Sequence, residues 1–465
     1  MPGSHEQGDA QRFAAMCVPV RARVQADDPV NRAREWALAL VARLGPGSLP
    51  PPGPIPGTTP RVLLIRPDHL GDVLCTSPAV QWIQSVCPWA TITYMSGPWS
   101  AEVAARLPGV LRVWSYPFPG FARSGPPGPL ARILPYLRLW WLARQVRAAR
   151  FDLAVNLRPD FWWGAALMYL AHIPRRLGYL TPGTAPFLTD GLPPPESLTA
   201  GSAPSDDVDD GTELALHQHV VEHNLDLAEI ALAELGQGYL DRQSPPVTLE
   251  PTEADRAEAF RLWALHRLDA PRPGAEWTIP PVIAVAPGAG SPAKVWAPER
   301  WALVIDHLAG RYGVRCLVTG TAAEKPLAER LVAALSTPAA VVAGETSVGV
   351  LATLLQQCRL AIGPDNGMLH LAAAMGVPTV RLFGPADPVL FGPYGPTAAD
   401  RQAHAVVQTP RPCAACGYLD LPPPPQAMYP CMADITAEEV IAAALRVWVA
   451  TEDDAPRRRG RATTD

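Results

Sequence analysis

The segment RVLLIRPDHLGDVL, residues 61–74, decides the fold at this end of the chain. It opens with RVLLI, a short apolar run of the kind that makes a strand buried on both faces of a parallel sheet. A polar loop follows, and a helix is expected to start near Ser77. A strand, a loop and a helix in this order predict the first βαβ unit of a domain that begins at residue 61.

The same rhythm continues along the chain. Apolar runs predict further strands at 91–95, 111–115 and 152–157, with helical stretches between them. A second series of strands and helices follows, in which Thr346 is expected to cap one helix. Such alternation is typical of doubly wound α/β domains. The five strands predicted in the second series lie at 282–286, 314–319, 339–343, 359–362 and 379–383.

Breaks in this rhythm predict the domain limits. Pro- and Gly-rich sequence at 271–281 indicates an interdomain connection, so we expect Rossmann-like domains at 61–270 and 271–450, facing a cleft where a ligand binds. Residues 181–213 are expected to form an irregular excursion before a helix at 214–235. The ends are expected to be an extension at 1–60, with a helix at 30–44 and a linker at 45–60, and a disordered tail at 451–465.

Composition excludes several classes of protein. Hydrophobic residues make up 48% of the 465 positions and charged residues 18%, which fits a globular protein. A net charge of −5 gives no reason to expect a nucleic-acid partner. The eight cysteines form no regular framework, and residues 1–11 lack the features of a signal peptide, so we expect reduced thiols and a cytoplasmic protein.

The first chemical motif is the loop at 66–74. At the carboxyl end of a parallel strand such a loop faces the crevice of the sheet. Gly71 would permit a backbone turn, and Asp72 would place a carboxylate beside a helix start, either for catalysis or only as a cap or dipole partner. No G-x-G-x-x-G or P-loop follows the first strand, so hydride transfer and simple ATPase activity are disfavoured.

The second motif is APGAGSPAKVW at 286–296. The small residues Gly288, Gly290 and Ser291 would let backbone N–H groups approach a phosphate, and Lys294 would supply a point charge. Lys294 and Lys325 are the only two lysines of the sequence, and the other Lys or Arg positions are all arginine. The alternative is a glycine-rich turn with an incidental surface lysine.

The third motif is GPDNGMLH at 363–370, before an Ala-rich helix. Asp365 would accept hydrogen bonds from hydroxyls, or would merely cap the helix. The helix start and its dipole predict a pocket for a diphosphate. A weaker fourth element is Glu324, which could hold the hydroxyls of a ribose or simply favour the helix dipole. The diphosphate pocket is expected at Asn366, Gly367, Met368, Leu369 and His370.

Together with LFGPADP at 382–388 and GPYG at 392–395, these motifs resemble glycosyltransferase family 9, the ADP-heptose:lipopolysaccharide heptosyltransferase family, over about residues 61–445. The resemblance implies a GT-B architecture with the acceptor in the first domain and the nucleotide sugar in the second. It implies that Asp72 is the catalytic base, Lys294 contacts phosphate and Asp365 binds the sugar. The helix start at 366–370 would cradle the diphosphate, and Glu324 matches the ribose carboxylate more loosely.

The expected function is therefore metal-independent, inverting transfer of a sugar from a nucleotide sugar, with ADP-heptose as the expected donor and no cofactor. The acceptor would be a lipopolysaccharide-type glycolipid or another glycan. The alternatives are a non-catalytic sugar-nucleotide binding module and another GT-B enzyme such as a sugar-nucleotide epimerase. The former would bind nucleotide through Lys294 without transfer, and the latter would act on the donor without an acceptor.

Two further patterns stand outside this function. Cys413-x-x-Cys416 followed by Cys431 suggests a metal knuckle, but a structural zinc site needs four ligands and only His404 offers a fourth, so we expect no metal. Residues 132–150 carry Trp140 and Trp141 among five arginines. This segment would suit an interfacial helix on anionic lipid at the inner face of the cytoplasmic membrane, or would pack on the first sheet with its arginines outward.

Overall fold

The chain is described by a computed structural model in which residues 59–119, 121, 130–195, 218–238, 241–269, 279–395, 397–417, 419 and 428–452 are placed. These residues form two compact units, one ending at Pro245 and one starting at Pro246. The division precedes the boundary expected at residue 270, because α11 (Glu253–Leu265) packs on α14 (Val348–Gln356) of the second unit. The helix predicted at 30–44 and nearly all of the predicted linker and tail lie outside the described residues.

A six-stranded parallel sheet forms the centre of the N-terminal unit, in the order β3-β2-β1-β4-β5-β6. The structure confirms the four strands predicted before residue 160 and adds β5 and β6. Prediction missed β5 because its arginines and glycine hide the apolar pattern, and β6 lies in the segment expected to be irregular. The strands are β1 (Arg61–Ile65), β2 (Thr91–Ser96), β3 (Arg112–Ser115), β4 (Leu153–Asn156), β5 (Arg175–Tyr179) and β6 (Asp190–Leu192).

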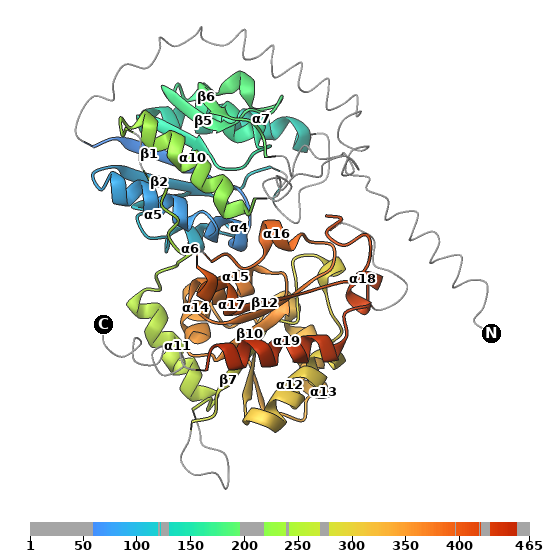
Figure 1. Cartoon of the computed structure of the whole chain (residues 1–465). Helices are drawn as coiled ribbons and strands as arrows, with labels where there is room; N and C mark the ends of the chain where they lie inside the picture. Colours follow the sequence, from blue (N-terminus) through green and yellow to red (C-terminus); the bar gives the residue numbers. More distant parts are fainter. Residues whose placement is uncertain are drawn as a thin grey trace, which may run out of the picture. The chain divides into compact units, whose positions relative to one another are not determined.

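Helices cover both faces of this sheet, as expected for a doubly wound unit. α5 packs on α10, and α7 packs on α8 (Figure 1). The core beside α7 and α8 contains Leu142, Val146, Leu167 and Trp163, all buried. The helices are α4 (Leu70–Leu74), α5 (Ser77–Val86), α6 (Ala101–Ala104), α7 (Leu130–Ala148), α8 (Trp162–Leu170), the 3-10 turn η1 (Ala185–Phe187) and α10 (Val220–Glu234).

The C-terminal unit is built on a second six-stranded parallel sheet, in the order β12-β11-β10-β7-β8-β9. All five strands predicted from the sequence are confirmed. The sixth, β12, was missed because it is an edge strand with only Val407 buried, so its apolar signal is weak. The strands are β7 (Val282–Val285), β8 (Arg315–Val318), β9 (Ala339–Val341), β10 (Leu360–Pro364), β11 (Thr379–Phe383) and β12 (His404–Gln408).

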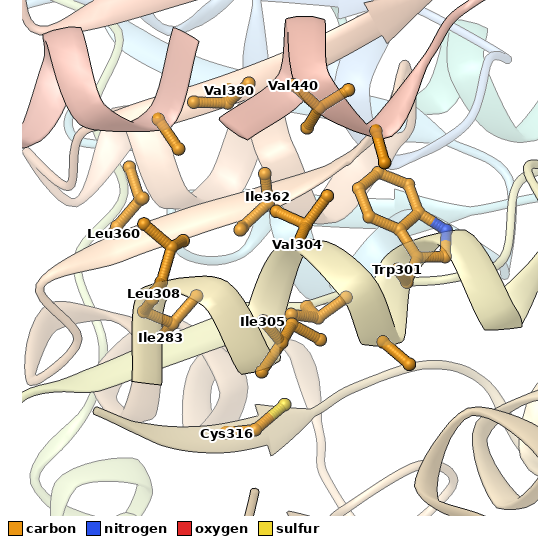
Figure 2. Packing of buried hydrophobic residues seen from close by; sticks show 14 of the residues in the cluster. Ile283, Trp301, Val304, Ile305, Leu308, Cys316, Leu360, Ile362, Val380 and Val440 are labelled. Carbon is orange, nitrogen blue, oxygen red and sulfur yellow. The ribbon is translucent and has the colours of Figure 1, made fainter. Parts of the chain in front are cut away.

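One face of this sheet is covered by α12 (Pro298–Tyr312) and α19 (Ala437–Ala450). Residues 301, 304, 305 and 308 follow the helical repeat, and their side chains pack on strand residues such as Ile283 and Ile362 (Figure 2). The remaining elements are η3 (Pro292–Lys294), η4 (Ala322–Glu324), α13 (Lys325–Ala334), α15 (Gly367–Ala374), α16 (Pro388–Phe391), α17 (Ala398–Gln402) and α18 (Pro430–Ala433).

One helix cap differs from its prediction. The N-cap of α14 is Ser347, whose hydroxyl accepts a hydrogen bond from the Val350 N–H at 3.2 Å, so Thr346 does not fill this role. The correct residue is one position later, and Ser is the more favourable of the two residue types at an N-cap. Among the helices of the described residues, none is both long enough and apolar enough to cross a membrane.

Candidate active site

The loop after β1 folds differently from the sequence prediction. α4 begins at Leu70, so Gly71 and Asp72 lie in a short helix and Gly71 forms no separate turn. The N-cap is His69, and Asp72 therefore does not cap this helix. The Asp72 side chain is 32% exposed, and its Oδ1 lies 3.7 Å from Arg66 Nη2. Asp72 is thus a solvent-reachable carboxylate beside a guanidinium at the carboxyl edge of the first sheet.

A buried ionic cluster stands beside Asp72. Arg66 Nε lies 2.6 Å from Asp68 Oδ2, and both side chains are only 6% exposed. The other Asp68 oxygen accepts a bond from Arg158 Nη1, and Arg66 Nη1 donates to the Leu157 carbonyl at 2.6 Å. Burial disfavours the charge of Arg66, but Asp68 and Asp72 outweigh it and raise the guanidinium pKa. Asp68 therefore holds two arginines close to Asp72.

Arg158 is a residue that sequence reasoning missed. It follows β4, the strand beside β1, so the carboxyl ends of both strands bring it to the same edge as Asp72. Asp68, Asp160 and Asp72 raise its pKa against the opposing effect of burial. Its position could have indicated a site residue, because it is a charged residue directly after a buried strand of a parallel sheet.

In the C-terminal unit, the loops after β7 and β10 bring three predicted residues together. β7 lies between β10 and β8, so the strand order reverses between β7 and β10. Doubly wound folds bind ligands at such a switch point. Lys294 Nζ donates to Asp365 Oδ2 at 2.9 Å. His370 Nε2 lies 3.5 Å from the other oxygen, Oδ1. Residues 71 positions apart in sequence thus form one charged cluster.

The charges of this cluster are set by its burial. Burial alone would raise the pKa of Asp365, but the bond from His370 and the charge of Lys294 hold it well below its usual value. Burial and the nearby Arg381 lower the pKa of His370, although Asp365 opposes them. Lys294 carries three donors, of which one is used by Asp365, so others can meet a ligand.

Arg381 is a second residue that the sequence did not single out. Its side chain is buried in β11, with 1% of the residue exposed, and it donates to the Leu369 carbonyl at 3.0 Å and to Thr379. It lies under the helix that starts at residue 367. Its place inside a hydrophobic strand gave no sequence signal for a charged contact with His370.

The start of α15 has local features that favour an anion. The helix begins at Gly367, and its N-cap is Asn366, whose Oδ1 accepts from the Leu369 N–H at 3.1 Å. Asp365 therefore does not cap the helix, contrary to the alternative reading of the motif. Helix geometry leaves the N–H groups of Gly367 and Met368 without intrahelical acceptors. Together with the helix dipole, they favour an anion close to Lys294.

The glycine loop and Glu324 adjoin this helix start. Asn366 Nδ2 donates to the Gly288 carbonyl at 2.8 Å. A Cβ on Gly288 would lie 2.2 Å from Glu324 Oε1, so glycine permits this carboxylate to approach the loop. Glu324 Oε2 completes a capping box with Thr321 at 2.7 and 2.8 Å. Glu324 thus caps η4 through one oxygen, while its Oε1 faces the loop.

The other predicted loop residues have separate positions. Ser291 is buried, accepts from the Ala293 N–H at 3.1 Å as the cap of η3, and donates to the Leu419 carbonyl. Gly290 is exposed. The C-terminal unit thus joins Gly288, Lys294, Glu324, Asp365, Asn366 and His370 in one area, and Asp72 belongs to the N-terminal unit.

Comparison with known proteins finds similarity to one family. The profile of Glycosyltransferase family 9 (heptosyltransferase) matches residues 208–416, which include the whole Lys294–Asp365–His370 cluster. Lipopolysaccharide heptosyltransferase 1 of Pseudomonas aeruginosa is 27% identical over 362 residues, covering 77% of this chain and 86% of the relative. Lipopolysaccharide heptosyltransferase 2 of Salmonella typhimurium is 24% identical over 333 residues, covering 70% and 84%. The chain is thus similar to glycosyltransferase family 9 and to its lipopolysaccharide heptosyltransferases.

Solved structures show that this glycosyltransferase shares the fold of the family. The glycosyl transferase family 9 protein of Veillonella parvula matches with a TM-score of 0.61 at 22% identity, covering 84% of this chain and 97% of that one. The ADP-heptose lps heptosyltransferase II of E. coli matches with a TM-score of 0.60 at 21% identity, covering 84% and 99%. The chain therefore has the predicted GT-B fold, with two parallel α/β units.

The cysteines of this glycosyltransferase fall into two groups. Cys75, Cys87, Cys316 and Cys358 are buried free thiols, which confirms their predicted state. Cys413, Cys416 and Cys431 are half-buried, and burial, with Cys416 nearby, raises the pKa of Cys431 to about 11. His404 Nδ1 lies 2.9 Å from the Thr379 hydroxyl. Within the described ranges, no three His, Cys, Asp or Glu side chains are arranged to hold a metal ion.

Proposed function

We propose that this family 9 enzyme transfers a heptose from ADP-heptose to a hydroxyl of a lipopolysaccharide-type glycan, with inversion at the anomeric carbon and without a metal or cofactor. The observation that carries the proposal is the Lys294–Asp365–His370 cluster beside the N–H groups that start α15. The relatives in Salmonella typhimurium and Pseudomonas aeruginosa are lipopolysaccharide heptosyltransferases. Their names support the sugar and the acceptor class.

The donor would bind through chemistry present in the C-terminal unit. Lys294 and the N–H groups of Gly367 and Met368 favour a diphosphate, because an ammonium and a helix start both attract anions. Asp365 can accept bonds from sugar hydroxyls with its remaining lone pairs, and Glu324 Oε1 is available to a ribose. An E. coli heptosyltransferase of the same fold is known with ADP and with ADP-2-deoxy-2-fluoro heptose, at TM-scores of 0.56 and 0.53.

In the proposed reaction Asp72 acts as the general base. The Asp72 carboxylate takes the proton of the acceptor hydroxyl, and the oxygen forms a bond to the anomeric carbon from the face opposite the diphosphate. The bond between this carbon and the diphosphate oxygen breaks, and its electron pair leaves with ADP. Lys294 and the α15 N–H groups stabilise the growing negative charge, and one such donor is worth roughly 10²–10³ in kcat. The proposal requires Asp72 to reach the donor sugar during catalysis.

Lys294→Met tests the donor site, with Lys325→Met as the matched control. Lys325 is the other lysine of the chain and is exposed on α13. Loss of a hydrogen bond to a charged group corresponds to roughly ten- to hundredfold weaker binding. Calorimetric titration with ADP should show this loss for Lys294→Met alone. Equal affinities in the two variants would remove Lys294 from the diphosphate site.

Asp72→Asn tests the base, with Asp160→Asn as an exposed acidic control from the same unit. A missing general base lowers the rate by roughly 10²–10⁴. ADP affinity should remain unchanged, because Asp72 is assigned to the acceptor side. Mass spectrometry of heptose-deficient lipopolysaccharide after incubation with ADP-heptose reads the transfer. Undiminished turnover in Asp72→Asn would refute its role as base, and preference for another sugar in a nucleotide-sugar panel would refute the heptose assignment.

A further inference from the structure

Helix α7 presents two tryptophans to solvent. Trp140 is 57% exposed and Trp141 is 59% exposed. The opposite side of the helix is buried and joins the core of the N-terminal unit through Leu139, Leu142, Ala143 and Val146. These four positions follow the helical repeat, so the part of the helix from Arg138 onward packs on the core through one side. The expectation that this segment packs on the first sheet is confirmed, and the tryptophans are not needed for that packing.

The same outward side is strongly basic. Arg138, Arg144 and Arg147 are exposed, and none of them forms an ion pair with an acidic side chain in the part of the chain that the structure describes. Arg144 lies over the Trp140 ring, 4.9 Å from its centroid. Residues 130–150 contain five arginines and no Asp or Glu. An uncompensated positive charge is thus combined with two large exposed aromatic rings on one helix.

This combination matches the chemistry of an anionic lipid surface. Tryptophan prefers the boundary between headgroups and acyl chains, because its ring is apolar and its N–H is polar. Arginine forms paired hydrogen bonds with phosphate. Single-stranded nucleic acid also binds arginines and aromatic rings, but it is normally held along a positively charged groove. Here the groups lie on the outer face of one helix, which favours a flat anionic surface such as a bilayer.

We propose that the outward face of α7, defined by Arg138, Trp140, Trp141, Arg144 and Arg147, docks on a bilayer that contains anionic phospholipid. The arginines would lie at the phosphate level, and the tryptophan rings would enter the headgroup region. This surface belongs to the N-terminal unit, and the donor cluster belongs to the C-terminal unit. Docking of α7 on a bilayer therefore does not depend on the donor and acceptor assigned above.

Vesicle flotation with the full-length chain tests the docking surface. Binding to phosphatidylcholine vesicles is compared with binding to vesicles that also contain phosphatidylglycerol. The wild type should bind only the anionic vesicles, and added salt should weaken binding because surface charges are screened. Each basic residue near an anionic surface contributes enough for about fivefold in binding, so Arg138→Gln/Arg144→Gln/Arg147→Gln should lose roughly a hundredfold.

Two matched controls test whether vesicle binding depends on this surface or on any exposed arginines and tryptophans. Arg256→Gln/Arg261→Gln/Arg330→Gln removes the same charge from exposed sites on other helices. Trp89→Ala removes a tryptophan that is 48% exposed on the same unit, for comparison with Trp140→Ala/Trp141→Ala. Only the α7 variants should lose vesicle binding, and circular dichroism and ADP titration should show that they remain folded and bind nucleotide.

Several results would overturn the proposal. One is equal binding of the wild type to neutral and anionic vesicles, and another is an equal loss in the α7 and control variants. A third is no vesicle binding by the wild type together with α7-dependent binding of single-stranded RNA. A fourth is dimerisation of the wild type in solution that the tryptophan variant abolishes, since the rings would then bind a second copy.

Discussion

Replacing Asp68 by asparagine tests whether the buried cluster beside Asp72 stabilises the N-terminal unit. The substitution keeps the size of the side chain but removes the charge that faces Arg66 at 2.6 Å, where both side chains are only 6% exposed. Removing one partner of a buried ion pair costs about 3–5 kcal/mol, because the remaining charge stays buried without compensation. For a unit of this size, that loss corresponds to a decrease in Tm of roughly 6–20 °C.

The same cluster supplies its own control. Asp160 lies 2.8 Å from Arg158 Nε, but its side chain is 56% exposed. An exposed pair contributes about 0–1 kcal/mol, so Asp160→Asn should change Tm by no more than a few degrees. Thermal and urea unfolding of the full chain, followed by circular dichroism, measure both variants. The double variant Arg66→Met/Asp68→Asn should be more stable than Asp68→Asn, because it removes the buried Arg66 guanidinium that Asp68→Asn leaves without this carboxylate.

The reasoning would be refuted if Asp68→Asn lost no more stability than Asp160→Asn. That outcome would mean that water reaches Arg66 and solvates it as well as the carboxylate does. It would also be refuted if the double variant were less stable than Asp68→Asn, since the arginine would then stabilise the fold mainly through its bond to the Leu157 carbonyl at 2.6 Å.

Three further predictions concern the C-terminal unit. Reductive methylation read by mass spectrometry should show that ADP protects Lys294 and leaves Lys325 unchanged; equal protection would contradict the diphosphate site. Because folding lowers the pKa of Asp365 below its unfolded value of about 4, its charge adds stability that is complete above roughly pH 5 and lost as the pH falls. Urea titrations should therefore show a smaller acid loss for Asp365→Asn than for the wild type, and parallel losses would count against the buried carboxylate. Burial raises the pKa of Cys358, so iodoacetamide should label the half-buried Cys413 first in peptide maps, and the reverse order would contradict the described burial.

The strands of the interior could be predicted from local pattern alone. β1 and β11 begin and end where the sequence predicted, because both are runs of residues that are almost wholly buried in the middle of a parallel sheet. β5 could not be recognised in this way, since Arg175 and Arg176 interrupt its apolar pattern and are buried with polar partners outside the strand. Arg175 pairs with Glu234 at 2.8 Å, and Arg176 donates to the carbonyls of Ile173 and Phe187.

Some residues of the candidate site could likewise be predicted from the sequence, and others could not. The motifs that contain Asp72, Lys294 and Asp365 could be found from residue type and position after a strand, and the family resemblance assigned their roles. Arg158 and Arg381 could not, because a single arginine in or after a strand has many explanations. Their partners lie 90 residues away for Arg158 and Asp68, and 12 residues away for Arg381 and Leu369.

The alternation of buried strands and helices, the glycine loop and the motifs at strand ends could all be predicted from the sequence, because these features depend on neighbouring residues. Three features became clear only in the folded protein: Asn366 rather than Asp365 caps α15, Asp68 joins two arginines, and the tryptophans of α7 lie outside the core. The physical reason is that burial and ion pairing depend on which segments come into contact in the folded protein. The pattern of neighbouring residues does not specify these contacts.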